Sequence, residues 1–311
     1  MRIVFMGTPD FAVPCLENLL QSNHEVVAVF SQPDKPVGRK QVLTPPPVKQ
    51  LAMQYDVPVY QPERLKDSDA AEVIRALQPD IIVVVAYGKI LRSDILTAAP
   101  LGCINVHASL LPKYRGAAPI QWAVINGEKE TGVSVMQMDE GLDTGDILLT
   151  RKTYIGEDET SEDLFDRLSA IGADALLEAL EQLELGTACP QKQPEGDFGY
   201  AKMITKDLCP IDWRKPASEI HNLVRGLQSW PVATAVFNGE VLKIHKTSVF
   251  DEFSCEGEHL PGFILPIVNR LVVCCGNETY LEILELQRQG KKRMEAKAFM
   301  QGFHLTNGHF E

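Results

Sequence analysis

The chain contains 311 residues, of which 45% are hydrophobic and 23% charged, a composition typical of globular proteins that excludes a collagen-like or disordered chain. Its 30 Lys and Arg against 42 Asp and Glu leave a formal net charge of −12, a balance that, taken globally, argues against a nucleic-acid partner. The mean hydropathy is −0.08, no apolar run approaches the roughly 20 residues that span a bilayer, and the N-terminus lacks the apolar segment of a signal peptide, so we expect a cytoplasmic protein.

The first half of the chain alternates strand and helix patterns. Short apolar runs predict strands over 2–6, 25–31, 57–60, 80–86 and 102–107. Helical periodicity lies between them, over 11–21, 47–55, 69–77, 92–98 and 119–126. Such alternation predicts an α/β domain with a Rossmann-like, mostly parallel sheet covered on both faces. Two further strands, 132–138 and 147–150, and a long amphipathic helix over 161–185 complete this domain, which we place at residues 1–188.

The last hundred residues have a different pattern. A helix over 217–227 precedes short strand-like runs at 233–237, 240–248, 262–265, 270–274 and 280–286, separated by turn residues. This pattern predicts a small OB-like β-barrel domain over 208–311. The polar, Gly- and Pro-containing segment 189–207 is interpreted as an interdomain linker. Seven scattered cysteines, odd in number, give no disulfide framework.

Basic residues are concentrated in two places. Residues 208–311 carry 11 Lys and Arg against 12 Asp and Glu, which leaves 19 basic and 30 acidic residues in 1–207. One basic cluster lies in the proline-rich stretch 32–47, which is too long for an ordinary strand–helix connection and therefore indicates either function or disorder. A second surrounds Lys291, Lys292 and Arg293. Basic clusters are commonly solvated surface, but such patches also steer a polyanion onto an acidic protein.

Several familiar kinds of site are disfavoured. The turn after the first predicted strand, 7–12 (GTPDFA), lacks the second glycine of a dinucleotide-binding turn, and no Walker A sequence occurs. No G-x-S-x-G sequence surrounds Ser109, which argues against a nucleophilic serine. The acidic residues of 139–146 lack EF-hand spacing, and no Cys or His spacing indicates zinc, so we expect no metal.

Asn105 and His107 are the most informative pair. They lie two residues apart at the carboxyl end of a predicted buried strand, so alternation places both side chains on one face, where open α/β sheets bind ligands. An amide donor beside an imidazole suits oxyanion stabilisation and proton transfer. The alternative is a buried histidine satisfied by backbone partners. A carboxylate to orient the imidazole is available in 139–146, although several acids in one loop are commonly turn formers.

These residues resemble a known family. Residues 105–112 (NVHASLLP) with 115–119 (RGAAP), and then 141–146 (GLDTGD), look like the two signatures of the 10-formyltetrahydrofolate-dependent formyltransferases. Other matches extend over nearly the whole chain and are similar to the methionyl-tRNA formyltransferases in particular: FMGTPDFAVP, QPDKPVGR, VVVAYGKIL, IDW and GKKRM. The resemblance implies a formyl-transfer domain with a Rossmann-like sheet, followed by an OB-like barrel that helps to hold tRNA.

The resemblance also implies a reaction and its residues. The free α-amino group of initiator methionyl-tRNA would attack the formyl carbon of 10-formyltetrahydrofolate, with no metal and no covalent enzyme intermediate. Asn105 would donate to the formyl oxygen, and His107 would help to stabilise the oxyanion. Asp143 would hold the imidazole and favour its charged form. We expect a monomer.

Binding residues follow from the same resemblance. The folate would contact Ser109, Leu110, Leu111 and Pro112, with Tyr87, Gly88, Ile90 and Leu91 beside the pterin. Phe11 would line a pocket for the methionine side chain, its alternative being an ordinary core contact. Contacts to tRNA would come from Arg39, Lys40, Lys291, Lys292 and Arg293. After Lys40 the chain departs from relatives with more lysines, since Gln41, Val42 and Leu43 are uncharged.

Other activities fit part of this pattern. A formyltransferase acting on glycinamide ribonucleotide normally ends after the first domain, which the C-terminal hundred residues disfavour. An amino-sugar nucleotide formyltransferase has a similar second domain, but the basic loop and tail fit tRNA better. A formyltetrahydrofolate hydrolase would use water in place of the amine. A noncatalytic RNA-binding module is disfavoured by Asn105, His107 and Asp143.

Overall fold

The computed structural model describes the chain except residues 39, 67, 251–258, 266 and 303–307. The chain divides into two compact units. Unit 1 comprises Met1–Gly116, Glu130–Tyr154 and Phe165–Ala201, and unit 2 comprises Ala117–Lys129, Ile155–Leu164 and Lys202–Glu311. The last junction between the units, after Ala201, falls inside the segment 189–207 that the sequence predicts as a linker.

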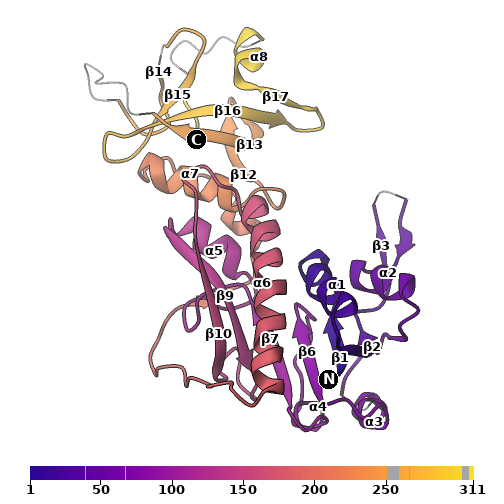
Figure 1. Cartoon of the computed structure of the whole chain (residues 1–311). Coiled ribbons are helices and arrows are strands. Elements are labelled where there is room, and N and C mark those ends of the chain that lie inside the picture. Colours follow the sequence, from indigo (N-terminus) through magenta and orange to yellow (C-terminus); the bar gives the residue numbers. More distant parts are fainter. Residues whose placement is uncertain (39, 67, 251–258, 266, 303–307) are drawn as a thin grey trace. The chain divides into compact units, whose positions relative to one another are not determined.

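Among the described residues, unit 1 forms a seven-stranded sheet in the order β10-β9-β7-β6-β1-β2-β5 (Figure 1). Its strands are β1 (Arg2–Gly7), β2 (Glu25–Phe30), β5 (Val59–Tyr60), β6 (Ile81–Val85), β7 (Cys103–His107), β9 (Glu130–Gln137) and β10 (Ile147–Tyr154). The neighbouring strands β7, β6, β1, β2 and β5 are parallel. Strand β9 pairs antiparallel with β7, and β10 pairs antiparallel with β9. The chain runs outward from β1 to β5 and then resumes on the other side of β1 with β6 and β7, a reversal beside which open α/β sheets bind ligands.

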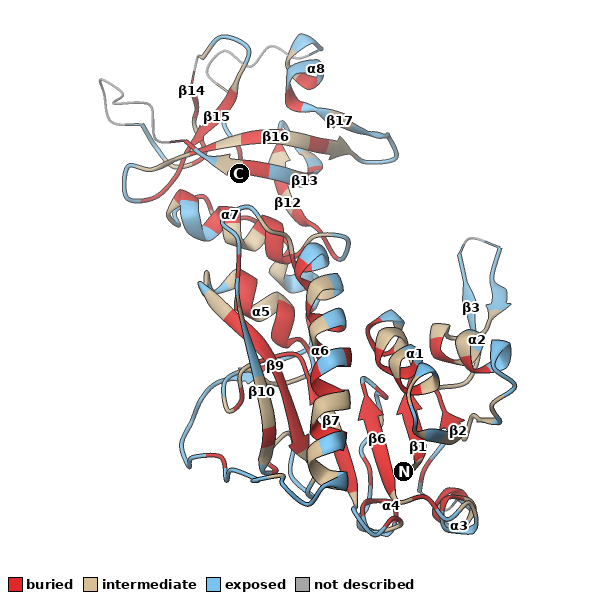
Figure 2. Ribbon diagram, viewed as in Figure 1, coloured by how far each residue is buried: buried red, intermediate tan, exposed pale blue. Residues whose placement is uncertain are grey.

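Helices cover both faces of this sheet. They are the 3-10 turn η1 (Asp10–Ala12) and the α-helices α1 (Val13–Gln21), α2 (Pro47–Gln54), α3 (Ala70–Ala76), α4 (Ser93–Leu96) and α6 (Ser161–Glu184). On one face, Ile74 of α3 and Ile95 of α4 share a cluster with Val84 of β6. On the other, α6 approaches so closely at Gly172 that an added Cβ would lie 3.0 Å from Val106 of β7. Because both faces are covered, β6 (IIVVV) is buried along its whole length (Figure 2).

Capping defines the ends of α6. The Thr160 hydroxyl accepts a hydrogen bond from the Asp163 backbone N–H at 3.1 Å, and the Asp163 carboxylate accepts one from the Thr160 N–H, also at 3.1 Å. This reciprocal capping satisfies donors that the first helical turn leaves open. The helix ends before Gly186, whose φ of +67° suits a residue without a Cβ.

Unit 2 is built on an antiparallel sheet. Its described strands follow the order β12-β13-β16-β15-β14, with β17 paired to β16. They are β12 (Ala233–Phe237), β13 (Glu240–Val249), β14 (Ile264–Leu265), β15 (Leu271–Cys274), β16 (Tyr280–Arg288) and β17 (Arg293–Glu295). The helices of this unit are α5 (Pro119–Ile125), α7 (Ala217–Gly226) and α8 (Ala296–Gln301), together with the 3-10 turn η2 (Lys206–Leu208). One core joins the inner face of the sheet to α5, α7 and α8.

The predicted fold class is confirmed, a parallel-rich α/β sheet followed by a curled antiparallel sheet. The stretch 32–47, for which the sequence predicts no strand, contains β3 (Lys35–Val37) and β4 (Val42–Thr44), which pair as a hairpin. Two-residue strands also escaped the sequence patterns: β8 (Arg115–Gly116) pairs in parallel with β11 (Tyr200–Ala201). Such short segments are too brief to show a period of two.

Candidate active site

Strand β7 carries Asn105 and His107 to the carboxyl end of the sheet. Asn105 pairs with Val84 of β6 and with Met136 of β9, so the strand is held from both sides. Val106 faces α6, and alternation turns Asn105 and His107 to the opposite face. The Asn105 carboxamide is partly exposed and makes no hydrogen bond with the part of the chain that the structure describes. It is therefore available to a ligand.

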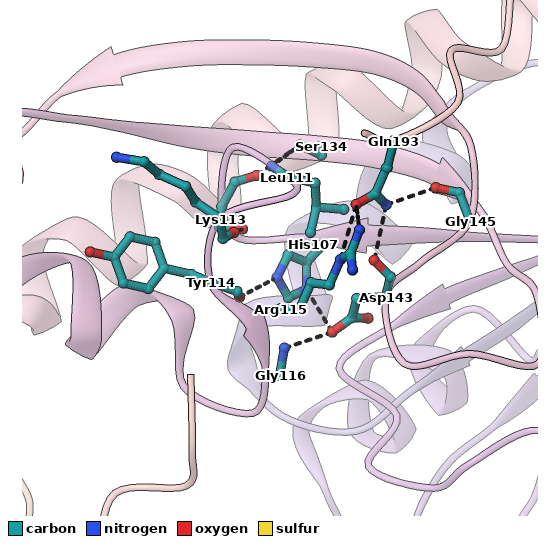
Figure 3. Close-up of polar contacts among 11 residues, drawn as sticks. His107, Leu111, Lys113, Tyr114, Arg115, Gly116, Ser134, Asp143, Gly145 and Gln193 are labelled. Atoms are coloured by element: carbon teal, nitrogen blue, oxygen red, sulfur yellow. Dashed lines mark hydrogen bonds and ion pairs between the residues drawn. The ribbon is translucent and has the colours of Figure 1, made fainter. Parts of the chain in front are cut away.

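His107 is buried, exposing 6% of its surface, and both its ring nitrogens face oxygen atoms (Figure 3). Nε2 lies 3.0 Å from the Tyr114 carbonyl, which only accepts, so Nε2 carries the hydrogen. Nδ1 lies 3.7 Å from Oδ2 of Asp143. That separation is an ion-pair distance beyond a hydrogen bond, and catalytic contacts commonly shorten when substrate binds. The pair resembles other catalytic His–carboxylate arrangements in which the acid orients the ring.

A tightly folded turn presents Asp143. It connects β9 to β10, and the Asp139 carboxylate accepts hydrogen bonds from the Gly141 N–H at 2.9 Å and the Thr144 hydroxyl at 2.7 Å. An added Cβ at Gly145 would lie 1.7 Å from the Gln137 carbonyl oxygen, so only glycine fits there. Asp143 has a φ of 54°, a conformation that Asp tolerates better than most residues. Gly141, Gly145 and Asp139 thus fix the conformation of the turn that presents the Asp143 carboxylate.

The Asp143 carboxylate has a second partner. Its Oδ2 accepts a hydrogen bond of 2.8 Å from the backbone N–H of Gly116, at the end of β8 (Figure 3). An added Cβ at Gly116 would lie 2.5 Å from Cε2 of Tyr200. The structure therefore brings Asp143 together with His107, two of the side chains that the sequence singles out.

The other candidate folate residues divide into supporting and exposed positions. In the segment after β6, Tyr87 and Leu91 belong to the buried cluster under α3 and α4. The Tyr87 hydroxyl has no partner among the described residues, and burial raises its pKa to about 12. Gly88 is exposed, and Ile90 exposes 83% of its surface. The surfaces open to a ligand are thus Gly88 and Ile90, whereas Tyr87 and Leu91 hold the segment.

The stretch 109–112 is fixed by hydroxyl groups. Ser109 is fully buried and donates to the Lys113 carbonyl at 2.7 Å. Ser134 of β9 donates to the Ser109 carbonyl at 2.8 Å and accepts from the Leu111 N–H at 3.1 Å. Ser134 is a residue that the sequence did not single out, because a serine within an apolar strand carries no distinctive pattern. Leu110 and Pro112 remain partly exposed beside this anchored backbone.

Phe11 lies in the core near the start of α1. Its ring packs edge-to-face on Phe165 of α6 at a centroid distance of 5.3 Å, and it exposes 5% of its surface. Its carbonyl accepts a hydrogen bond from Ser169 at 2.9 Å. These contacts fix its position, and a role toward methionine stays a prediction.

The basic candidates differ in their surroundings. Lys40 is exposed between β3 and β4, whereas Arg39 lies outside the described residues. Lys49 of α2, just after this stretch, is bound to Asp34 at 2.8 Å and to Gln61 at 2.7 Å, and these contacts lower the pKa of Asp34. In unit 2, Arg293 is paired with Glu285. Lys291 and Lys292 are exposed and form no ion pair within the described ranges.

Gln193 is a buried polar residue of the site that the sequence analysis did not single out. It lies in the segment 189–207 and hydrogen-bonds to Arg115 and to the turn carrying Asp143 (Figure 3). A glutamine in a polar stretch looks like solvated linker, and only the tertiary structure shows that it is buried.

No group of three or more His, Cys, Asp or Glu suited to a metal ion occurs in the described part of the chain, and none of its helices is long and apolar enough to cross a membrane.

The chain is similar to known proteins over nearly its whole length. A family model described as formyl transferase matches residues 1–180, and one described as formyl transferase, C-terminal domain, matches 203–304. A methionyl-tRNA formyltransferase of Caldanaerobacter subterraneus subsp. tengcongensis is 48% identical over 309 residues, covering 99% of both chains. Another from Trichlorobacter lovleyi is 48% identical over 308 residues, covering 99% of this chain and 96% of that protein.

The fold is also similar to that of solved structures. A sugar 3N-formyl transferase crystallised with dTDP and 5-N-formyl-THF superposes with a TM-score of 0.71 at 21% identity, covering 94% of this chain and 99% of that one. At that identity the similarity concerns the fold alone. The two matching family models together extend over both compact units, and the curated relatives match at full length. The chain therefore belongs to the formyl transferase family.

Proposed function

We propose that this protein transfers the formyl group of 10-formyltetrahydrofolate to the α-amino group of initiator methionyl-tRNA, giving formyl-methionyl-tRNA for translation initiation. The observation that carries the proposal is the pair of buried His107 and half-buried Asp143, beside the free carboxamide of Asn105, in a chain that is 48% identical at full length to a methionyl-tRNA formyltransferase. The amine is itself the nucleophile, so the protein has to bind, orient, stabilise charge and move protons.

The three side chains divide this work. When 10-formyltetrahydrofolate is bound, it supplies an activated formyl group. Asn105 donates a hydrogen bond to the formyl oxygen, since its amide is not engaged by the described chain. His107 holds positive charge beside the same oxygen, where negative charge develops. Asp143 keeps the ring oriented and accepts the proton that the attacking amine loses, directly or through water.

Two neighbouring segments suit the folate. Because β6 and β7 are adjacent and parallel, residues 87–91 and 109–112 leave the sheet at the same edge. Gly88 and Ile90 offer the exposed surface of the first segment, and Leu110 and Pro112 that of the second. Ser134 holds the second segment in place. The residues present therefore fit a planar, amphipathic ligand at this edge.

The tRNA is held by basic residues in both units. Lys40, next to Arg39 in the sequence, lies in the connection between β3 and β4, and Lys291 and Lys292 lie between β16 and β17. Lys40, Lys291 and Lys292 are free of described ion pairs, so they are available to phosphates, whereas Arg293 is engaged by Glu285. Phe11 lines the site of the methionine side chain. The proposal includes a monomeric protein acting in the cytoplasm, where charged initiator tRNA is used.

One assay tests this function. The purified chain is incubated with 10-formyltetrahydrofolate and charged initiator tRNA, and formyl-methionine and tetrahydrofolate are quantified together. Equal amounts of both products are expected. Tetrahydrofolate release without formyl-methionine would indicate hydrolysis, and formylation of a nucleotide amino sugar in place of the tRNA would indicate a sugar formyl transferase; either result contradicts the proposal.

A further inference from the structure

Gln193 is a buried amide in an otherwise exposed segment. It exposes 6% of its surface, whereas Gln191, Lys192 and Pro194 around it are exposed. A buried carboxamide requires partners for two donor hydrogens and for its oxygen. All of these requirements are met by the β9–β10 turn and by strand β8, which lie far away in the sequence.

The amide nitrogen of Gln193 binds the turn that carries Asp143. Nε2 donates to the Asp143 carbonyl at 2.9 Å and to the Gly145 carbonyl at 2.8 Å. Its Oε1 accepts from Arg115, from Nε at 3.1 Å and from Nη2 at 2.6 Å (Figure 3). One side chain thus connects the β9–β10 turn to strand β8.

Asp143 is consequently held at both its ends. The backbone carbonyl is bound by Gln193, and the carboxylate is bound by the N–H of Gly116, the residue after Arg115. A change in the separation between the turn and β8 would therefore move the carboxylate relative to His107. Gln193 and Arg115 bridge that separation.

Gln193 is itself fixed on both sides. Before it, Gln191 and Ile147 exchange backbone hydrogen bonds of 2.9 and 2.8 Å. After it, β11 pairs with β8. The backbone of segment 191–201 is therefore anchored to unit 1 on both sides of Gln193, which fixes the position of the Gln193 side chain.

We propose that Gln193 is a positioning residue for formyl transfer, which holds the Asp143 turn at the distance from β8 that directs the carboxylate toward His107. The inference rests on the function proposed above. It assigns a role in the reaction to the segment between the two matched family regions, which the sequence predicts as a linker.

Two substitutions separate the two halves of the Gln193 contact, and a third serves as the control. Gln193→Met keeps the length of the side chain and removes its donors and its strong acceptor. Gln193→Glu keeps an acceptor for Arg115 and removes both donors to the turn. Gln191→Met is the matched control, because that side chain is exposed and the contacts of Gln191 are made by its backbone.

Steady-state kinetics with both substrates, together with thermal unfolding, give the first readout. Both Gln193 variants are expected to lose about 10- to 100-fold in kcat, because a small displacement of a catalytic group is costly. KM for either substrate should change little, and Gln191→Met should behave as the wild type. The unfolding temperature of the Gln193 variants should fall, because Asp143, Gly145 and Arg115 lose buried hydrogen bonds. A Gln193→Glu variant with wild-type kcat would show that the contact to Arg115 alone matters, and it would overturn the proposal.

A double-mutant cycle gives the second readout, which a merely structural role would not move. If Gln193 acts through Asp143, Gln193→Met should lower kcat less than about threefold in the Asp143→Asn background. The charged carboxylate that Gln193 positions is already absent in that background. An undiminished loss in that background contradicts the proposal. Arg115→Lys leaves Gln193 intact and loosens its anchor, so it reports the same coupling if the Gln193 variants unfold. An inactive wild type contradicts the proposed function, whereas an active wild type with an equally active Gln193→Met contradicts only the role of Gln193.

Discussion

The carboxylate of Asp143 lies 3.7 Å from Nδ1 of His107, while Nε2 of the same ring donates to the Tyr114 carbonyl. Both nitrogens therefore face oxygen atoms, which fixes the orientation of the ring. In the proposed reaction this ring lies beside the formyl oxygen, where negative charge develops when the amine attacks. The contact thus links the orientation of the imidazole to the chemistry proposed for it.

Asp143→Asn is expected to lower kcat by about 10²- to 10⁴-fold, the range typical of removing an acid–base group. The amide oxygen of Asn still accepts from Gly116, so the fold should persist, but the charge facing His107 is gone. Single-turnover formylation measures the loss. Asp146→Asn is the control because Asp146 is exposed and contributes a backbone carbonyl to Gln137. A turnover within tenfold of wild type would contradict the role of Asp143.

Asn105→Ala is expected to lower kcat by about 10²- to 10³-fold. Removing one oxyanion donor has an effect of this size in other enzymes. The side chain makes no described hydrogen bond, so its removal should leave the unfolding temperature nearly unchanged. Kinetics and thermal unfolding of the same preparation check both statements. Normal kcat would exclude Asn105 as the donor, and a large drop in stability would point to a structural role.

Gly145→Ala should inactivate the protein without removing any functional group. The added Cβ would lie 1.7 Å from the Gln137 carbonyl oxygen, so the turn carrying Asp143 must move. We expect a loss of kcat comparable to that of Asp143→Asn. Gly302→Ala is the control, since its φ is −98° and the nearest atom to the new Cβ is 3.7 Å away. Full activity of Gly145→Ala would show that the position of this turn is not critical.

His221 makes unit 2 sensitive to acid. Burial lowers the pKa of His221 from its ordinary value of 6.5, assisted by the charge of Arg225, while the Glu157 carbonyl, Asp158 and Thr247 oppose the shift. The Thr247 hydroxyl lies 3.0 Å from Nδ1, and the Glu157 carbonyl lies 3.3 Å from Nε2. These partners fit a neutral ring that donates to Glu157 and accepts from Thr247.

The sign of the pH effect follows from that shift. Below pH 6.5 the unfolded chain binds the proton more readily than the folded chain does, so the free energy of unfolding decreases as the pH falls from about 6.5 through the folded pKa. Above 6.5 the contribution is fully present. Denaturant unfolding between pH 8 and pH 5 should show a weaker decrease in His221→Gln. His24 and His245, whose pKa values burial also lowers, keep part of the dependence. An unchanged pH dependence would contradict the assignment.

Salt dependence tests the proposed binding of tRNA. Replacing Lys291 and Lys292 by Ala should reduce the slope of log affinity against log salt by about 0.7 to 0.9 for each phosphate that the protein no longer neutralises. Arg293→Gln should change the slope less, because Glu285 already neutralises that guanidinium. Binding of charged tRNA at several salt concentrations provides the measurement. A slope unaltered by the Lys substitutions would remove this turn from the interface.

Much of the fold follows from local patterns. An uninterrupted run such as Ile81–Val85 indicates a strand covered on both faces, and the structure buries it completely. The hairpin β3–β4 escaped prediction because its strands are short and exposed, so they carry no apolar alternation. The pairing of β8 with β11 joins residues that are far apart in the sequence, which no local pattern reports.

The candidate active site was predictable from the sequence to a similar extent as the fold. Strand alternation places Asn105 and His107 on one face, but Asp143 stands among four acidic residues whose spacing does not distinguish them. Only the family resemblance selected it, and the structure shows that its carboxylate, rather than a neighbour's, contacts His107. Gln193 was unpredictable because its burial depends on Arg115 and Gly145, contacts that exist only in the folded chain. The catalytic roles of these residues stay predictions.

The pairing of β8 with β11 has a consequence for synthesis. A nascent chain has released Asn105, His107 and Asp143 well before Tyr200 and Ala201 leave the ribosome. Until then β8 lacks its partner strand, and Gln193 has not reached the turn. A chain interrupted after Glu184 would hold every proposed catalytic side chain and lack the segment that binds the Asp143 turn. Full activity therefore depends on a piece of chain that contributes no catalytic group and arrives late.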